Sequence, residues 1–334
     1  MKIDKDGQRV RALGLCSGGL DSLLALLVVQ NQGIEVTALT FVSPFLDGEK
    51  ARDGSAALGI PHRIVDFTPQ HLKVVKDPKF GYGANMNPCL DCHILMIRLA
   101  DEIRSQEGYH FIFTGEVVGQ RPMSQNRAAL DLVAKNSGAA EYLVRPLSAK
   151  RLPPTRPEEE GWLERERLLG LQGRGRKPQM ALAQEYGITD YPSPAGGCIL
   201  TDPGFSRRLR RLFEGRPDAG AREVGLLYWG RHFDLGGGQW LILGRDKADN
   251  EALFELIRPE DIVLQAANLP GPLGLIPGPA EAKDEILELA GRILLAYTKA
   301  SGPLAQVSLR GAAGQRILDL PVEGKESFEE RLIL

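Results

Sequence analysis

A short run of glycine, serine and aspartate near the start of the chain has the composition of a phosphate-binding loop. The segment 15–22 reads LCSGGLDS and lies between an apolar run at 10–15 and an apolar stretch at 20–32, a pattern that predicts a strand, a tight turn and a helix. Such a junction directs backbone N–H groups and a positive helix dipole at one point, which suits a phosphate. The candidate ligands are Ser17, Gly18, Gly19, Asp21 and Ser22, and Asp21 is also suited to hold Mg²⁺.

This loop is not of the Walker A type. No G-x-x-x-x-G-K-[ST] occurs in the chain, and the segment 170–177 comes nearest with Arg176 in place of the lysine. The two adjacent glycines leave no Cβ between the backbone and a phosphate. The alternative interpretation is an ordinary glycine-rich turn that binds nothing.

Three of the four cysteines are candidates for sulfur or metal chemistry. Cys89 and Cys92 precede an apolar-periodic stretch at 94–104, so they are predicted at a helix N-terminus, where the dipole lowers the pKa of a thiol. Cys198 lies in a loop rich in proline and glycine at 190–203. Three converging thiols suit a 4Fe-4S cluster with one open iron, a persulfide with a resolving cysteine, or zinc with His93 as a fourth ligand.

Two simpler interpretations concern the remaining cysteine and a familiar motif. Cys16 ends the first apolar run and is expected to be a small buried side chain. A zinc-dependent base deaminase also carries Pro-Cys-x-x-Cys, but it needs an upstream His-x-Glu, and none occurs here. That class of enzyme is therefore excluded.

Alternating strands and helices are predicted to position these residues. Strands are expected at 10–15, 34–41, 62–65, 109–114 and 142–147, with helices between them. This alternation favours an α/β fold, an open parallel sheet with helices on both faces. Ligands of such sheets bind beyond the carboxyl ends of the strands, which is where the phosphate loop and the cysteine loops are expected to meet.

The length of 334 residues favours two domains. We expect a first domain at 1–215 and a smaller α+β domain at 222–334, separated by a polar, glycine-rich stretch. In the second domain, strands are predicted at 239–244, 262–265, 274–277 and 307–309, and helices at 248–257 and 281–297.

Composition and charge restrict the partners. The net charge is −2, so a nucleic acid would be contacted through local basic patches. One candidate patch is a predicted short helix that carries Arg207, Arg208, Arg210 and Arg211, for which the alternative is a solvated face. The first eleven residues lack a signal-peptide core, and no apolar run approaches the roughly 20 residues that span a bilayer. A cytoplasmic protein with no membrane contact is expected.

The loop at 15–22 resembles the SGGxDS loop of the PP-loop ATP pyrophosphatases, which implies an adenine nucleotide alpha hydrolase-like fold and cleavage of ATP between its α and β phosphates. Thr114-Gly115-Glu116 with Gly119-Gln120 and Ser124-Gln125 looks like the matching stretch of tRNA 4-thiouridine synthetases. Asn87-Pro88-Cys89 resembles the cysteine loop of tRNA 2-thiouridylases, and Ala195-Gly196-Gly197-Cys198 their later cysteine loop. Further ATP-binding residues implied by this resemblance are Thr40, Phe41, Gly115 and Gln120.

The C-terminal part resembles the RNA-binding domain of the NFACT family. Gly230-Arg231-His232-Phe233 and the segment 243–251 carry this likeness. It implies RNA contacts from Arg231 and Arg245, in place of the THUMP region of longer thiouridine synthetases. The alternative is a dimerisation or capping domain.

Together these resemblances predict an ATP-dependent tRNA thiouridine synthetase. Asp21 and the loop would bind MgATP, a uridine carbonyl oxygen would be adenylated, and sulfur held at Cys89, Cys92 and Cys198 would displace AMP. A 4Fe-4S cluster ranks before a persulfide, because related enzymes with this cysteine pattern hold one. Expected partners are tRNA, a sulfur donor (inorganic sulfide or a cysteine desulfurase system) and a second copy in a homodimer. The rivals are a small-molecule ATP pyrophosphatase or amidating synthetase, and an RNA-binding protein with a vestigial loop.

Overall fold

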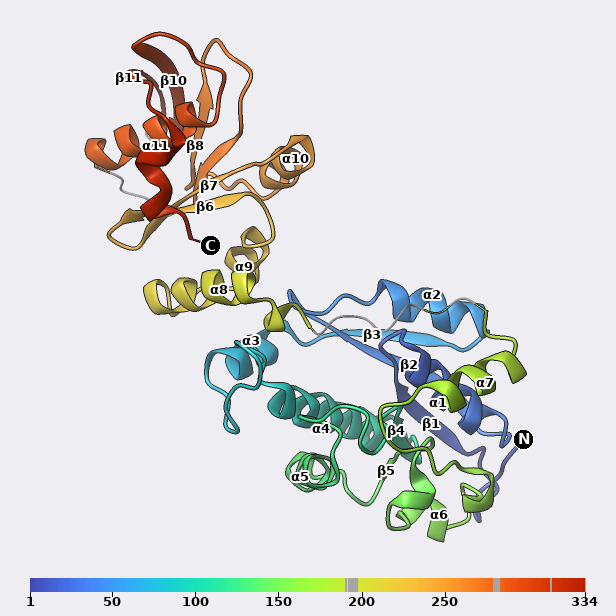
Figure 1. Ribbon diagram of the computed structural model, residues 1–334. Coiled ribbons are helices and arrows are strands. Elements are labelled where there is room, and N and C mark those ends of the chain that lie inside the picture. Colours follow the sequence, from blue (N-terminus) through green and yellow to red (C-terminus); the bar gives the residue numbers. More distant parts are fainter. Residues whose placement is uncertain (190, 192–197, 279–282, 313, 334) are drawn as a thin grey trace. The chain divides into compact units, whose positions relative to one another are not determined.

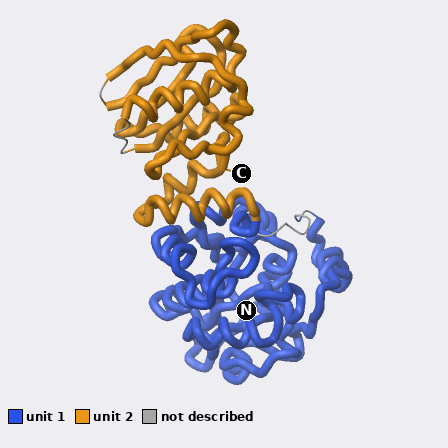
Figure 2. Tube along the Cα trace, turned by 60° about the vertical axis from the view of Figure 1, so that its left-hand side comes forward, with its two compact units in different colours: residues 1–201 blue, residues 202–334 orange. Residues whose placement is uncertain are grey.

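The computed structural model describes residues 1–189, 191, 198–278, 283–312 and 314–333. The chain divides into two compact units, Met1–Thr201 and Asp202–Leu334 (Figure 2). Among the described residues, no helix combines the length and the apolar character needed to cross a bilayer.

The first unit is built on a five-stranded parallel sheet, as the sequence predicts (Figure 1). Its strand order is β3-β2-β1-β4-β5, so the first strand lies at the centre. The strands are β1 (Arg11–Leu15), β2 (Glu35–Val42), β3 (His62–Asp66), β4 (Phe111–Thr114) and β5 (Leu143–Val144). Because the chain order reverses beside β1, the loop that follows this strand opens at the position where such sheets bind ligands.

Helices cover both faces of this sheet (Figure 1). Successive strand residues point to opposite faces: Ala12 packs in the core with α1, and Leu13 packs in the core with α4. The helices are α1 (Leu20–Gln30), α2 (Glu49–Ala57), α3 (Thr68–Lys76), α4 (Cys89–Glu107), α5 (Arg127–Ser137), α6 (Arg156–Glu159) and α7 (Lys177–Glu185), with the 3₁₀ turns η1 (Ala149–Arg151), η2 (Arg165–Arg167) and η3 (Ile199–Thr201).

The structure adds elements that the sequence pattern did not predict. Helix α3 and helix α5 lie in stretches without an assigned helix, and Asn126 caps α5 by accepting a hydrogen bond from the N–H of Ala129. The last strand is only two residues long, against six predicted. The reason is that the chain turns at Arg145, whose side chain enters the core of the unit.

The second unit is an antiparallel six-stranded sheet with helices, in agreement with the predicted α+β class (Figure 1). Its strand order is β11-β10-β8-β9-β7-β6. One core cluster packs under α11, and another packs under α10. The elements are α8 (Pro203–Gly215), α9 (Ala221–Leu226), β6 (Arg231–Gly236), β7 (Gln239–Leu243), α10 (Lys247–Glu255), β8 (Ile262–Ala266), β9 (Gly274–Ile276), α11 (Asp284–Ala296), β10 (Leu304–Gly311), β11 (Gly314–Pro321) and η4 (Lys325–Arg331).

Helix α8 belongs to this second unit, because the division between units falls at Thr201/Asp202. The sequence places the boundary after residue 215, at the polar stretch that follows the helix. The physical reason for the difference is packing: Phe205 of α8 contacts the ring of Tyr228, with ring centroids 4.9 Å apart.

Candidate functional site

The phosphate loop has the geometry that its glycines predict. Gly18 has a φ of 72°, a left-handed conformation that favours glycine. A Cβ at this position would lie 2.4 Å from the backbone of Lys50. The Ser22 hydroxyl donates to the Gly19 carbonyl at 2.7 Å, and Gly19, the N-cap of α1, makes no side-chain cap. The first turn of α1 therefore presents uncapped N–H groups beside Ser17, which is exposed.

Asp21 connects this loop to the segment that follows β4. The Nε2 atom of Gln120 donates to Asp21 Oδ2 at 2.5 Å, whereas Asp21 Oδ1 is buried and makes no hydrogen bond to any residue that the structure describes. Gly115 lies directly against the start of α1, because a Cβ there would stand 2.6 Å from the backbone of Asp21. The structure thus brings four predicted nucleotide-site positions, Asp21, Ser22, Gly115 and Gln120, to one edge of the sheet.

Two further predicted ATP residues lie at the end of β2. Thr40 is buried and donates to the carbonyl of Cys16 at 2.8 Å. Phe41 is buried and packs on Phe67, with ring centroids 5.3 Å apart. The side chain of Phe41 is thereby occupied in the core. Cys16 is buried as well, as predicted.

Helix α4 begins at Cys89, so the Cys-x-x-Cys forms its first turn. The Sγ atom of Cys89 lies 3.9 Å from Nε2 of His93, one turn along the helix. Burial alone would raise the pKa of Cys89, but the hydrogen bond and charge of His93, with a hydrogen bond to Ser124, outweigh it and lower the pKa. Cys89 is therefore the cysteine best placed to react as a thiolate.

Cys92 is in the opposite situation. Its side chain is buried, and burial together with the nearby Cys198 and Cys89 thiols raises its pKa well above the usual range. His71 Nε2 lies 3.0 Å from its Sγ, and His71 Nδ1 lies 2.8 Å from the Ser43 hydroxyl. Burial lowers the pKa of His71 to about 4, so this ring is neutral beside a neutral thiol.

Cys198 is held near the other two by contacts between their loops. The Met86 N–H donates to the Leu200 carbonyl at 3.2 Å, and the Asn85 side chain donates to the Thr201 carbonyl at 2.7 Å. Burial raises the pKa of Cys198, and the Cys89 thiolate adds to this. The three predicted cysteines therefore share one electrostatic environment. The neighbouring Ala195, Gly196 and Gly197 of the predicted loop lie outside the described residues.

No preformed metal site is found in the described part of the chain, where no three His, Cys, Asp or Glu side chains are grouped to hold an ion. The three thiols fit an iron–sulfur cluster by donor type. Cys92 and Cys89 are, however, each engaged by a histidine. His93 Nδ1 pairs with Glu116 and its Nε2 atom lies toward Cys89, an arrangement that is also compatible with the zinc ligand considered above.

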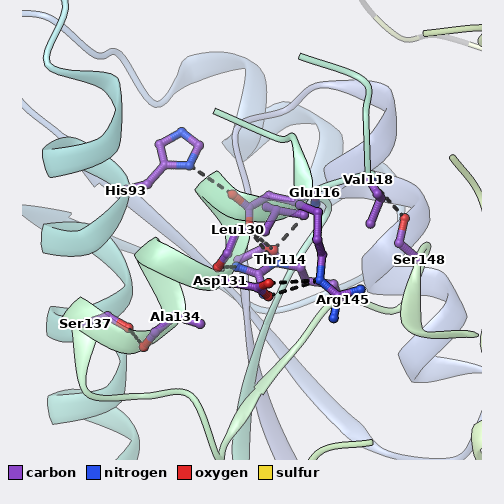
Figure 3. A network of polar contacts seen from close by, with 11 residues as sticks. His93, Thr114, Glu116, Val118, Leu130, Asp131, Ala134, Ser137, Arg145 and Ser148 are labelled. Atoms are coloured by element: carbon purple, nitrogen blue, oxygen red, sulfur yellow. Dashed lines mark hydrogen bonds and ion pairs between the residues drawn. The ribbon is translucent and has the colours of Figure 1, made fainter. Parts of the chain in front are cut away.

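A charge network connects His93, Glu116 and Arg145 (Figure 3). His93 Nδ1 donates to Glu116 Oε1 at 2.9 Å, and Arg145 Nε donates to Glu116 Oε2 at 2.8 Å. Burial alone would raise the pKa of Glu116, but the charge of Arg145 and the hydrogen bond from His93 hold it well below its usual range. Burial would lower the pKa of His93, but Cys89 and Glu116 raise it to about 10. His93 thus contacts the Cys89 thiol through Nε2 and the Glu116 carboxylate through Nδ1.

The end of β4 joins the two halves of the site. Gly115 packs on the phosphate loop, and the next residue, Glu116, orients His93 toward Cys89. Sequence reasoning missed His71, Arg145 and the role of Glu116. For the contact between Cys89 and His93, the sequence does carry a signal, because residues four apart lie on one helix face.

The predicted RNA-binding arginines lie in the second unit. Arg207, Arg210 and Arg211 are exposed on α8, whose opposite face is buried through Phe205 and Leu209. Arg208 is half-buried, and burial and the nearby Arg245 lower its pKa. Arg245 binds both carboxylate oxygens of Asp249, at 2.6 and 3.0 Å, and the Arg231 guanidinium lies 5.1 Å from the Tyr297 ring centroid.

The fold and the loop define the first unit as an α/β nucleotide-binding domain of the PP-loop class. Residues 7–150 match the family described as "Thiamine biosynthesis protein (ThiI)", and residues 230–324 match the "NFACT protein RNA binding domain". The chain is thus similar to the ThiI family over its first unit and to the NFACT RNA-binding domain over its second.

Curated relatives include proteins named as tRNA-thiolating enzymes. The chain is 25% identical over 61% of its length to "tRNA-specific 2-thiouridylase MnmA 1" of Syntrophus aciditrophicus, covering 61% of that protein. It is 31% identical over 42% of its length to "tRNA sulfurtransferase" of Desulfurococcus amylolyticus, covering 30% of it. A "Probable tRNA sulfurtransferase" of Anoxybacillus flavithermus is 25% identical, over 49% of this chain and 50% of that protein. The chain spans about half the length of the curated relatives it matches.

Among solved structures, a 4-thiouridine synthetase–RNA complex with bound ATP is 22% identical, with a TM-score of 0.35 over 55% of this chain and 54% of that one. A predicted subunit of tRNA methyltransferase from Methanocaldococcus jannaschii is 14% identical, with a TM-score of 0.38 over 63% of this chain and 89% of that one.

Proposed function

We propose that this protein is an ATP-dependent tRNA thiouridine synthetase. One observation carries the proposal: the end of β4 places Gly115 against the phosphate loop and Glu116 against the His93–Cys89 pair. A nucleotide site and a reactive thiol therefore meet at one edge of one sheet. The names of the curated relatives support tRNA as the substrate.

In the first step, the loop binds the phosphates of ATP. The uncapped N–H groups of α1 face the phosphates, and Asp21 Oδ1, buried with no hydrogen bond from the described residues, fits a ligand of Mg²⁺. The metal, when bound, neutralises charge that develops on the phosphates. The uridine carbonyl oxygen attacks the α phosphate, the bond to the β phosphate breaks, and pyrophosphate leaves. The ring nitrogen beside that carbonyl loses its proton.

In the second step, sulfur displaces AMP. A persulfide on Cys89 attacks the activated carbon through its terminal sulfur, and the carbon–oxygen bond to AMP breaks. The Cys198 thiolate then attacks Cys89 Sγ, so the sulfur stays on the uridine and a Cys89–Cys198 disulfide forms. An external dithiol reduces this disulfide before the next turnover. The hydrogen bonds of His93 and Ser124 to Cys89 support this assignment.

A cluster is the second form of the same proposal. Cys89, Cys92 and Cys198 would hold 4Fe-4S, which when bound supplies an open iron for inorganic sulfide. The all-thiol donor set favours this form, and the histidine contacts of Cys89 and Cys92 favour the persulfide. Iron and sulfide analysis after anaerobic purification separates them: about four irons per chain supports the cluster, and none supports the persulfide with a cysteine desulfurase as donor.

The second unit is proposed to bind the tRNA. The exposed arginines Arg207, Arg210 and Arg211 on α8, with Arg231 and Arg245 at the sheet, supply phosphate contacts. A homodimer stays a prediction, to be checked by light scattering.

Release of AMP and pyrophosphate from ATP tests the whole proposal. Uridine-containing tRNA is expected to stimulate this release. If a metabolite stimulates the release of AMP and pyrophosphate and tRNA does not change it, a small-molecule synthetase would be favoured. No release, together with tight tRNA binding, would favour the vestigial-loop alternative.

A further inference from the structure

Four buried polar atoms of the first unit have no hydrogen-bond partner among the described residues. They are Asp21 Oδ1, Gln125 Oε1, Arg176 Nε and Gln179 Oε1. Buried polar groups are nearly always paired, so each unpaired atom calls for a ligand or an ion. Asp21 belongs to the phosphate loop, but neither Arg176 nor Gln179 is among the ATP-binding residues that the sequence predicts.

A relay of side chains ties Gln179 to the phosphate loop. Gln179 Nε2 donates to Gln120 Oε1 at 3.3 Å, and Gln120 Nε2 donates to Asp21 Oδ2 at 2.5 Å. Because the Gln120 Oε1 atom already accepts a hydrogen bond from Gln179, Gln120 turns its NH₂ group to the Asp21 carboxylate. Gln179 is 1% exposed, so this orientation is fixed in the interior of the protein.

A positively charged residue immediately precedes the helix that carries Gln179, α7. Arg176 is its N-cap residue and Gln179 its third residue, and no side chain caps the helix. Arg176 stands three residues before Gln179, and its Nε atom is buried without a hydrogen-bond partner among the described residues. The Gly173 N–H donates to the Val118 carbonyl at 2.7 Å, which holds the start of α7 beside the loop that carries Gln120.

The phosphate loop itself lacks a cation, since segment 15–22 contains no lysine or arginine. ATP carries most of its charge on the β and γ phosphates. An arginine binds phosphate oxygens through paired N–H donors, and an uncapped helix N-terminus adds to the attraction.

We propose that Arg176 and Gln179 form a second wall of the nucleotide site, with Arg176 binding the β and γ phosphates and the departing pyrophosphate. Gln179 is a positioning residue that holds Gln120 against Asp21 and leaves Asp21 Oδ1 free for Mg²⁺. This inference rests on the proposed function only in requiring that the protein bind ATP.

Calorimetric titration of the full chain with MgATP, inorganic pyrophosphate and AMP tests the role of Arg176. Arg176→Ala is expected to weaken MgATP and pyrophosphate binding about tenfold or more, as for loss of a charged hydrogen bond, and to leave AMP affinity unchanged. Arg174→Ala, an exposed arginine in the same turn, is the matched control. Equal loss for AMP and ATP, or no loss for either, overturns the phosphate assignment.

Gln179 is tested through its effect on magnesium. Gln179→Glu has nearly the same shape but can no longer donate to Gln120, so we expect the Mg²⁺ concentration for half-maximal ATP binding to rise about tenfold. Gln184→Ala, an exposed glutamine on the same helix, should behave as the parent. An unchanged Mg²⁺ requirement in a folded Gln179→Glu overturns the positioning role. If the parent chain binds no ATP, the proposed function itself fails, which distinguishes the two results.

Discussion

His93 and Glu116 are joined by a hydrogen bond of 2.9 Å between Nδ1 and Oε1, although they come from a helix and from the end of a strand (Figure 3). On its other side, Glu116 accepts from Arg145, and both of these side chains are buried. The histidine is thus fixed with its Nε2 atom toward Cys89. Cys89 is therefore the reactive cysteine of the proposed sulfur transfer.

The buried ion pair should dominate the stability of this region. Arg145→Met removes one partner and leaves the Glu116 carboxylate short of a counter-charge in the interior, which typically costs about 3 kcal/mol or more of unfolding free energy. Urea unfolding measures this loss. Arg127→Met, which breaks an exposed pair with Asp131, should cost less than about 1 kcal/mol. Similar losses for the two variants would contradict the assigned burial.

The three thiols should differ in reactivity. Cys89 is expected to react with iodoacetamide fastest at pH 7, because His93 favours its thiolate, and Cys92 slowest, because it is buried with a raised pKa. Peptide mass spectrometry at timed intervals gives the order. His93→Gln should slow Cys89 about tenfold and leave Cys198 unaffected. Fastest labelling at Cys92 would exclude Cys89 as the sulfur carrier.

Local sequence patterns were sufficient to predict the sheet, the phosphate loop and the position of Cys89 at the start of a helix. Each of these depends on residues close together in sequence, such as the glycine pair before an apolar helix. His71 and Arg145 could not be found this way, since they meet Cys92 and Glu116 through tertiary contacts 21 and 29 residues apart. Gln179 is 59 residues from Gln120, and its burial follows only from the packing of α7.

His232 should make the second unit sensitive to acid. It is buried on β6, and burial together with the charge of Arg208 lowers its pKa to about 3. The unfolded chain takes up this proton below pH 6.5, so the stabilisation is present above pH 6.5 and is lost as pH falls toward 3. Lowering the pH from 7 to 5 is therefore expected to reduce the free energy of unfolding by about 2 kcal/mol through this histidine.

Urea unfolding at both pH values, followed by tryptophan fluorescence, measures this effect. Trp229 and Trp240 report on the second unit. His232→Leu should show a pH dependence smaller by about 2 kcal/mol than that of the parent chain. An identical pH dependence in the two proteins would contradict the neutral buried histidine.

The arginines of α8 should govern the salt dependence of tRNA binding. Each phosphate contact contributes to the slope of affinity against salt concentration, so Arg207→Ala with Arg210→Ala should reduce that slope by about two. Filter binding across a salt series provides the values. Arg316→Ala, at an exposed pair with Asp284 on the same unit, is the control. Equal slopes for the parent and the double variant would identify α8 as a solvated face.

Formation of a thiolated nucleoside is the most direct test of the central claim. The purified chain is incubated with MgATP, unmodified tRNA, a dithiol and a sulfur source, and the digested tRNA is analysed by mass spectrometry. We expect one uridine per tRNA to exchange oxygen for sulfur, in step with AMP release, and Cys89→Ser to abolish the product while ATP binding persists. AMP release without any thiolated uridine, under both sulfide and persulfide supply, would contradict the account.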